Sequence, residues 1–223
     1  MSDTLNILDL GKRDYKETWE LQKFLHKKRL GNRIKDTLIL VEHYPVITMG
    51  KSGKESNLLI PHRLLKEKGI EFFKIERGGD VTFHGPGQIV GYPIFNIRHG
   101  FVGIKPFIQK IEKAIILTLE AFGIAGLTRE RLIGVWTEAG KICSIGIAVQ
   151  RWISFHGFAL NVNTDLKCFD YIVPCGLKGI KMTSMAEILR KEIPPAQVKA
   201  GLKLNFGSEF DRNPVEICLN EII

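Results

Sequence analysis

Residues 77–88, RGGDVTFHGPGQ, constrain the fold more than any other stretch of this chain. Four glycines and a proline surround the short apolar run Val81-Thr82-Phe83. Glycine permits positive φ and close approach of the backbone, so we expect a short strand whose flanks expose backbone N–H and C=O groups. Such a wall suits a flat or extended ligand. The alternative is a hairpin with glycine-rich turns, but two glycine clusters around so short a strand are unusual for a hairpin.

This stretch differs from the common phosphate-binding loops. No helix follows it directly, as the dinucleotide-binding pattern G-x-G-x-x-G requires, and no Gly-Lys-Ser/Thr follows it, as a Walker loop requires. The pattern therefore favours a ligand wall over a nucleotide site.

Strand and helix patterns are mixed along the chain without regular alternation. We therefore predict an α+β (α/β) fold, a single domain over residues 1–223 with a mixed, mostly antiparallel sheet flanked by helices. Three short strand patterns between residues 134 and 163 predict an antiparallel meander, with tight turns at 138–140 and 150–151. Helices are expected at 14–30, at 105–122 and from Pro195 towards Gly207, with a capping box at 184–187.

The first of these helices carries clear end signals. Asp14 can cap its start, and Gly31 can end it. Its apolar residues predict a buried face made by Trp19, Leu21, Phe24 and Leu25.

Charge and hydropathy limit the classes of partner and location. The longest apolar run, at 114–119, is too short to span a membrane, and the acidic start has no apolar leader, so we expect a cytoplasmic protein. The 32 basic and 24 acidic residues leave a net charge of +8, which favours acidic partners. We predict no nucleic-acid binding, because no basic motif is interleaved with aromatic residues.

The four cysteines, Cys143, Cys168, Cys175 and Cys218, show no C-x-x-C spacing. A reducing compartment makes disulfides unfavourable. Zinc ligation by Cys168, Cys175 and His156 fits no common spacing, so no metal site is predicted.

Cys175 lies in a loop pattern, IVPCGLKG, between a stiff and a permissive residue. Pro174 restricts the backbone before the thiol, and Gly176 would let a reacting carbonyl approach backbone donors. The loop is typical of a presented nucleophile, although free cysteines are often simply buried.

A nucleophilic thiol needs a neighbour that stabilises the thiolate. His84, His156 and Lys141 are the candidates. Strand alternation would place His156 on one face with Trp152, Ser154, Phe158 and Leu160, a setting more typical of a packed histidine. Cys143 is the rival nucleophile, but its apolar strand favours packing.

Three stretches together resemble the lipoyl(octanoyl) transferases of protein lipoylation: 77–97, 141–163 and 172–185. Residues 38–53 resemble their N-terminal region more weakly, so the resemblance covers about 37–190. It implies the fold of the catalytic domain of biotin and lipoate protein ligases. It also implies transfer of an octanoyl group from octanoyl-acyl carrier protein to a lysine of lipoyl domains, such as those of the glycine cleavage H protein and of 2-oxoacid dehydrogenase acyltransferase subunits. No cofactor is implied.

The resemblance also implies roles for particular residues. Cys175 would accept the acyl group and Lys141 would activate it. One departure is Cys143, where the family more often has a small residue such as alanine. The implied substrate-binding residues are Arg77, Gly78, Gly79, Asp80, Val81, Thr82, Phe83, His84, Ser144, Ile145, Gly146, Gly157, Phe158 and Ala159.

The acyl chain would then lie against bare backbone and against Val81 and Phe83, with His84 at the mouth of the pocket. The residues leave two related activities as alternatives. An ATP-dependent lipoate or biotin ligase of the same fold would not need Cys175. An amidotransferase that moves octanoyl between lipoyl domains would also use a cysteine.

Overall fold

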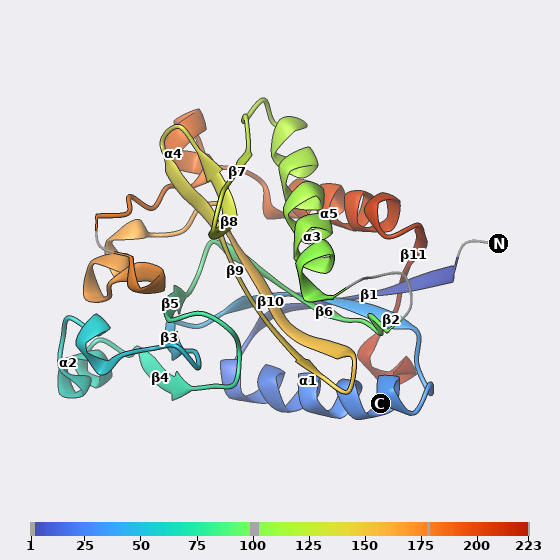
Figure 1. The fold of residues 1–223 in the computed structure, drawn as a ribbon. Coiled ribbons are helices and arrows are strands. Elements are labelled where there is room, and N and C mark those ends of the chain that lie inside the picture. Colours follow the sequence, from blue (N-terminus) through green and yellow to red (C-terminus); the bar gives the residue numbers. More distant parts are fainter. Residues whose placement is uncertain (1–2, 99–102, 178, 223) are drawn as a thin grey trace.

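The computed structural model describes residues 3–98, 103–177 and 179–222, and an eight-stranded sheet runs through its centre (Figure 1). The strand order is β11-β1-β2-β6-β10-β9-β8-β7. β1 pairs in parallel with β2 and β11, whereas the other neighbouring strands pair antiparallel, which confirms the predicted mixed sheet. The strands are β1 (Asp3–Arg13), β2 (Asp36–His43), β6 (Gln88–Ile94), β7 (Leu127–Arg129), β8 (Leu132–Thr137), β9 (Gly140–Gln150), β10 (Ile153–Asn161) and β11 (Arg212–Glu216).

A smaller sheet, which the sequence patterns did not reveal, lies beside the large one. Its order is β4 (Glu71–Lys74), β3 (Val46–Met49) and β5 (Val81–His84), with α2 (His62–Glu67) next to it (Figure 1). Its own apolar cluster joins residues of β3, α2 and β5 to Phe169, which lies in a short 3₁₀ turn. The glycine-flanked strand of the opening motif is therefore an edge strand, β5, of a separate small sheet.

Helices cover the two faces of the large sheet (Figure 1). α1 (Tyr15–Leu30) covers one face, where Leu25 packs with residues of β2, β6 and β10. α3 (Ile104–Glu120) and α5 (Pro195–Glu209) cover the other face, with α4 (Met185–Leu189) at its end. Short 3₁₀ turns lie at Glu55–Asn57, Leu166–Tyr171, Pro174–Gly176 and Leu219–Glu221. No helix in the described ranges has the length and apolar character needed to cross a membrane.

The predicted starts of α1, α4 and α5 are confirmed, whereas the helix predicted at 105–122 spans Ile104–Glu120. The Asp14 carboxylate accepts a hydrogen bond of 3.1 Å from the backbone N–H of Glu17, and Ser184 caps α4 in the same way. α5 begins at Pro195 as expected.

The predicted apolar face of α1 is wrong in part, because Phe24 is 39% exposed. The face that packs on the sheet instead carries Tyr15, Thr18, Gln22, Leu25 and His26. Polar groups there bond to the sheet: the Gln22 side-chain oxygen accepts from the backbone N–H of His156 at 2.8 Å. Because this face of α1 bonds to polar backbone groups, it carries polar side chains and lacks the apolar periodicity on which the prediction was based.

The meander of β8, β9 and β10 is confirmed as antiparallel, but two local predictions are wrong. The second turn lies one residue later, at Arg151 and Trp152, both with positive φ. His156 also has a positive φ of 56°, so strand alternation is interrupted there. Its ring lies 4.9 Å from that of its neighbour Phe155, and it does not share a face with Phe158 and Leu160.

Candidate active site

Cys175 and Lys141 are in contact, although 34 positions separate them. The ammonium nitrogen of Lys141 lies 3.1 Å from the Cys175 sulfur. Lys141 is only 2% exposed, and its ammonium also donates to the Ile133 carbonyl at 3.1 Å and lies 5.2 Å from the centre of the Trp136 ring. A buried cation beside a thiol stabilises the thiolate, which is the reactive form.

Backbone pairing brings the lysine to the cysteine loop. Lys141 is the second residue of β9, where its N–H donates to the Lys181 carbonyl at 2.8 Å and its carbonyl accepts from Thr183 N–H at 2.9 Å. The chain that follows Cys175 thus runs alongside the start of β9. Gly134 makes room for the lysine stem, because a Cβ there would lie 2.8 Å from Lys141 Cε. No pattern in the sequence pointed to Gly134.

Cys175 stands in a strained turn. Its φ is 58°, unusual for a residue other than glycine, and Gly176 follows with φ 68°. The Gly176 N–H donates to the Val173 carbonyl at 2.9 Å. That N–H is therefore engaged within the turn, and the expectation that Gly176 lets a carbonyl approach other backbone donors stays a prediction.

Asp80 lies beside the turn that carries Cys175 and bonds to residues around it. One of its carboxylate oxygens accepts from Val81 N–H at 2.7 Å and the other from the Asn57 side-chain amide at 2.6 Å. Asn57 in turn accepts from Val173 N–H at 2.8 Å through its carbonyl. A Cβ at Gly176 would lie 2.5 Å from the Asp80 carboxylate, so glycine is required by packing.

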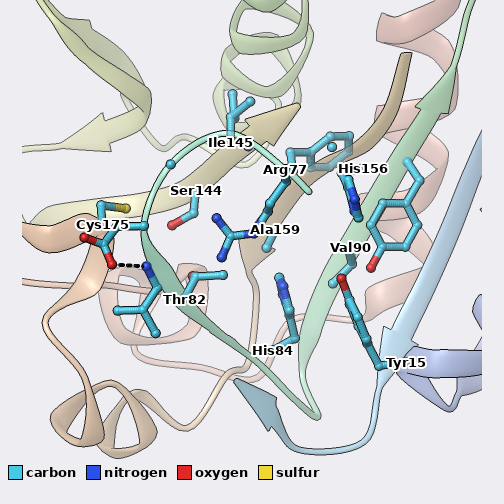
Figure 2. A pocket seen from close by; sticks show the side chains of 17 residues that line it. Tyr15, Arg77, Thr82, His84, Val90, Ser144, Ile145, His156, Ala159 and Cys175 are labelled. Carbon is cyan, nitrogen blue, oxygen red and sulfur yellow. Dashed lines mark hydrogen bonds between the residues drawn. The ribbon is translucent and has the colours of Figure 1, made fainter. Parts of the chain in front are cut away.

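A narrow pocket begins at Cys175 and runs between the two sheets (Figure 2). Its cavity volume is about 40 Å³, room for only a few water molecules. Four lining residues were not predicted as binding residues: Tyr15 and His156, which lie on α1 and β10, and Val90 and Tyr92 on β6. The predicted residues that line it are Arg77, Gly79, Asp80, Val81, Thr82, His84, Ser144, Ile145, Gly146, Gly157, Phe158, Ala159 and Cys175.

Two residues of the predicted binding segment do not line this pocket. Side chains alternate along β5, so Val81 and Phe83 share the face opposite to that of Thr82 and His84; Val81 still borders the pocket, whereas Phe83 does not. The Phe83 ring packs on Phe169 at 5.7 Å in the core of the small sheet. Gly78 bonds the loop to β9, where its N–H donates to the Ile147 carbonyl at 3.0 Å.

His84 lies inside the pocket and not at its mouth. It is 7% exposed, its Nδ1 lies 2.9 Å from the Gln88 side-chain oxygen, and its ring is stacked on Tyr15 at 6.0 Å. The predicted position at the entrance is therefore wrong.

Arg77 places a buried guanidinium in the middle of the pocket (Figure 2). It donates to the Thr48 carbonyl at 2.6 Å and to the Gly78 carbonyl at 3.0 Å. A Cβ at Gly50 would lie 2.8 Å from a guanidinium nitrogen, and one at Gly146 would lie 3.1 Å from Cδ. These two glycines therefore create the space for the Arg77 side chain.

The histidines around the pocket are neutral at physiological pH. Burial lowers the pKa of His84 to about 3 and that of His43 to about 4. Burial also lowers the pKa of His156 and raises those of Tyr15 and Tyr92. The deep part of the pocket is therefore lined by uncharged rings, apart from Arg77.

These lowered histidine pKa values predict a loss of stability in weak acid. Below the ordinary histidine pKa of 6.5, the unfolded chain binds protons at these positions, whereas His43 and His84 in the folded protein stay unprotonated. The stability that is present above pH 6.5 is therefore lost progressively towards pH 4 for His43 and pH 3 for His84. Between pH ~7 and ~5 we expect each histidine to lower the free energy of unfolding by about 2 kcal/mol. Urea denaturation at pH ~7 and at pH ~5 measures this change in the free energy of unfolding.

Two variants test the assignment. His84→Gln should remove about 2 kcal/mol of the pH-dependent loss. His62→Gln, whose side chain is 57% exposed in the parent, should leave that loss unchanged. An identical acid loss in wild type and His84→Gln would contradict the prediction.

Cys143 is packed in this fold. It is fully buried in the main core, burial raises its pKa, and its thiol donates only weakly to the Ser144 carbonyl at 3.6 Å. The neutral thiol is a poor nucleophile. No three His, Cys, Asp or Glu side chains gather as metal ligands within the described part of the chain.

Comparison with known proteins gives the family of this chain. Residues 14–207 match the family model of the lipoyl protein ligase A/B catalytic domain. The octanoyltransferase of Dictyoglomus thermophilum is 48% identical, with 88% of this chain and 83% of that protein covered. The octanoyltransferase of Flavobacterium psychrophilum is 42% identical, with 95% and 98% covered.

Solved structures confirm the fold. A bipartite lipoate protein ligase from Thermoplasma acidophilum superposes with a TM-score of 0.75 at 15% identity, covering 100% of this chain and 89% of that one. The biotin protein ligase from Aquifex aeolicus in complex with biotin and ATP gives 0.57 at 13% identity, covering 93% and 70%. Together with the sequence matches, this means that the chain belongs to the lipoyl protein ligase A/B catalytic-domain family, among the octanoyltransferases.

Proposed function

We propose that this enzyme moves an octanoyl group from octanoyl-acyl carrier protein to a lysine of a lipoyl domain through a thioester on Cys175. The contact of 3.1 Å between the Lys141 ammonium and the Cys175 sulfur carries the proposal. Relatives named octanoyltransferase support the acyl group and the reaction class. A ligase that activates a free acid with ATP has no need of this thiol.

The first half-reaction is a thioester exchange. In the ion pair the Cys175 proton is already on Lys141, and the thiolate attacks the octanoyl carbonyl. A new carbon–sulfur bond forms to Cys175, the bond to the carrier thiol breaks, and the Lys141 ammonium returns the proton to the leaving thiolate. One thioester replaces another of similar energy, so no ATP is required.

The second half-reaction forms an amide. The amine of the acceptor lysine attacks the Cys175 thioester, Lys141 accepts the proton that the nitrogen must lose, and Cys175 leaves as a thiolate. The amide is more stable than the thioester, which drives this half. Lysine suits both steps because a buried amine can alternate between its charged and neutral forms.

The pocket beyond Cys175 would hold the alkyl chain. Its cavity of about 40 Å³ is small, so entry of the chain requires lining side chains to move, and Arg77 is the longest of them. The net charge of +8 would favour association with acidic carrier and acceptor proteins. We propose the lipoyl domains of the glycine cleavage H protein and of 2-oxoacid dehydrogenase acyltransferase subunits as acceptors.

The test is octanoyl transfer to the glycine cleavage H protein, followed by intact mass, with different donors. We expect octanoyl-acyl carrier protein to support transfer without ATP. Transfer only from free octanoate with ATP and magnesium would identify a ligase. Faster transfer from an octanoylated lipoyl domain than from the carrier protein would identify an amidotransferase.

A further inference from the structure

The end of the pocket that lies away from Cys175 is closed by rings. In Figure 2, Cys175 lies on one side of the row of lining side chains, and Tyr15 and His156 lie on the other. Tyr15 is buried and stacks on His84 with a ring-centre distance of 6.0 Å. Tyr92 is held by a contact of 2.8 Å between its hydroxyl and His43 Nε2. These rings are fixed by their neighbours and form a firm end wall.

His156 is the member of this wall with an unusual backbone. Its φ of 56° turns the ring beside that of Phe155 and interrupts the alternation of β10. The side chain is buried, and its Nε2 has no hydrogen-bond partner among the described residues. The nearest carboxylate oxygen, on Glu76, lies 3.6 Å away. No strong hydrogen bond of that nitrogen therefore fixes the ring, which packs beside Phe155 and lines the pocket.

A second cavity lies behind His156. It is a groove of about 520 Å³ between α1 and the β9–β10 hairpin, with Lys23, Phe24, Phe155 and Glu76 among its lining residues. Glu76 is thus shared: its carboxylate lines the groove, contacts His156 and accepts from the Trp19 indole N–H at 3.3 Å. His156 lines the acyl pocket and Glu76, which contacts it, lines the groove, so these two side chains lie between the two cavities.

We infer that His156 determines the acyl chain length that this enzyme accepts, because its imidazole is the wall that the methyl end of the chain meets. The inference rests on the proposed function. A longer chain would have to push the imidazole against Glu76 and Trp19, which hold each other in place. A single methylene changes selectivity in an apolar pocket by about 10- to 200-fold, so a closed wall can distinguish chains that differ by a few carbons.

The test is competition between octanoyl- and dodecanoyl-acyl carrier protein at equal concentration, without ATP, with the Cys175 adducts read by intact mass. His156→Gly removes the wall and suits the positive φ. We expect it to raise the dodecanoyl-to-octanoyl adduct ratio by about tenfold or more. His156→Asn, which also tolerates positive φ, should raise the ratio less.

His26→Ala is the matched control. His26 lines the groove but not the acyl pocket, so this variant should keep the wild-type ratio. Octanoyl adducts with an unchanged ratio in both His156 variants would overturn the inference and leave the proposed function intact. No adduct from any donor in the wild type would overturn the proposed function and the inference together.

Discussion

Cys175→Ser is expected to abolish the octanoyl adduct and to lower octanoyl transfer by about 10⁴-fold. The serine hydroxyl is far less acidic than a thiol, so Lys141 at 3.1 Å no longer produces a reactive anion. The positive φ of residue 175 and the turn around it are unaffected by the exchange of sulfur for oxygen, so the loss reports chemistry and not folding. Intact mass after mixing with octanoyl-acyl carrier protein, and the transfer rate to a lipoyl domain, are the two measurements.

The other cysteines provide the controls for this experiment. Cys218→Ser changes an exposed thiol and should leave both readouts unchanged. Cys143→Ser should keep the adduct, because the Cys143 thiol is buried and its pKa is raised by burial. An adduct that survives in Cys175→Ser but disappears in Cys143→Ser would move the nucleophile onto β9 and refute the site described above.

Lys141→Met should slow the formation of the acyl-enzyme by about 10²- to 10⁴-fold. Methionine fills much of the same space beside Gly134 and Trp136 but supplies neither a charge for the Cys175 thiolate nor a proton for the leaving thiol. Single-turnover kinetics of the acyl-enzyme measures the effect. Lys181→Met, in which the lost side chain is 68% exposed, is the matched control and should acylate at the wild-type rate.

Lys141→Arg separates charge from proton transfer. Arginine keeps the cation but does not give up its proton in proteins. Because residue 141 must give a proton in the first half-reaction and accept one in the second, we expect Lys141→Arg to slow both, with acyl-enzyme formation slowed less than in Lys141→Met because the cation beside Cys175 is kept. Acylation of Lys141→Met at the wild-type rate would show that the contact with Cys175 has no part in the reaction.

Several features of the site were visible in local sequence. Pro174 and Gly176 indicated a loop that presents Cys175, and the structure has a turn there with two positive φ angles. The glycines around residues 77–88 indicated a bare wall, and β5 with its flanks does line the pocket. These features depend on the backbone preferences of single residues, which a sequence displays directly.

Other lining residues could not be found in that way. Tyr15 opens α1 and Tyr92 is one of seven buried residues on β6, so both resemble core positions. Phe83 is the opposite case. Its place in the glycine-rich motif suggested a binding residue, but its side chain packs in the core of the small sheet. Which face of a strand meets a cavity depends on how the two sheets pack, and no local pattern contains that information.

The sequence alone determined the mixed sheet, the main helices and the family, because each depends on local preferences or on motifs of consecutive residues, and it singled out Cys175 and Lys141 as candidates. Only the tertiary structure decided that Lys141 meets Cys175, that Cys143 is buried in the main core, and that aromatic rings line the pocket beside His156. The physical reason is register. The pairing of Lys141 with Met182 and the interruption at His156 set which side chains meet, and both arise from contacts between segments far apart in the chain.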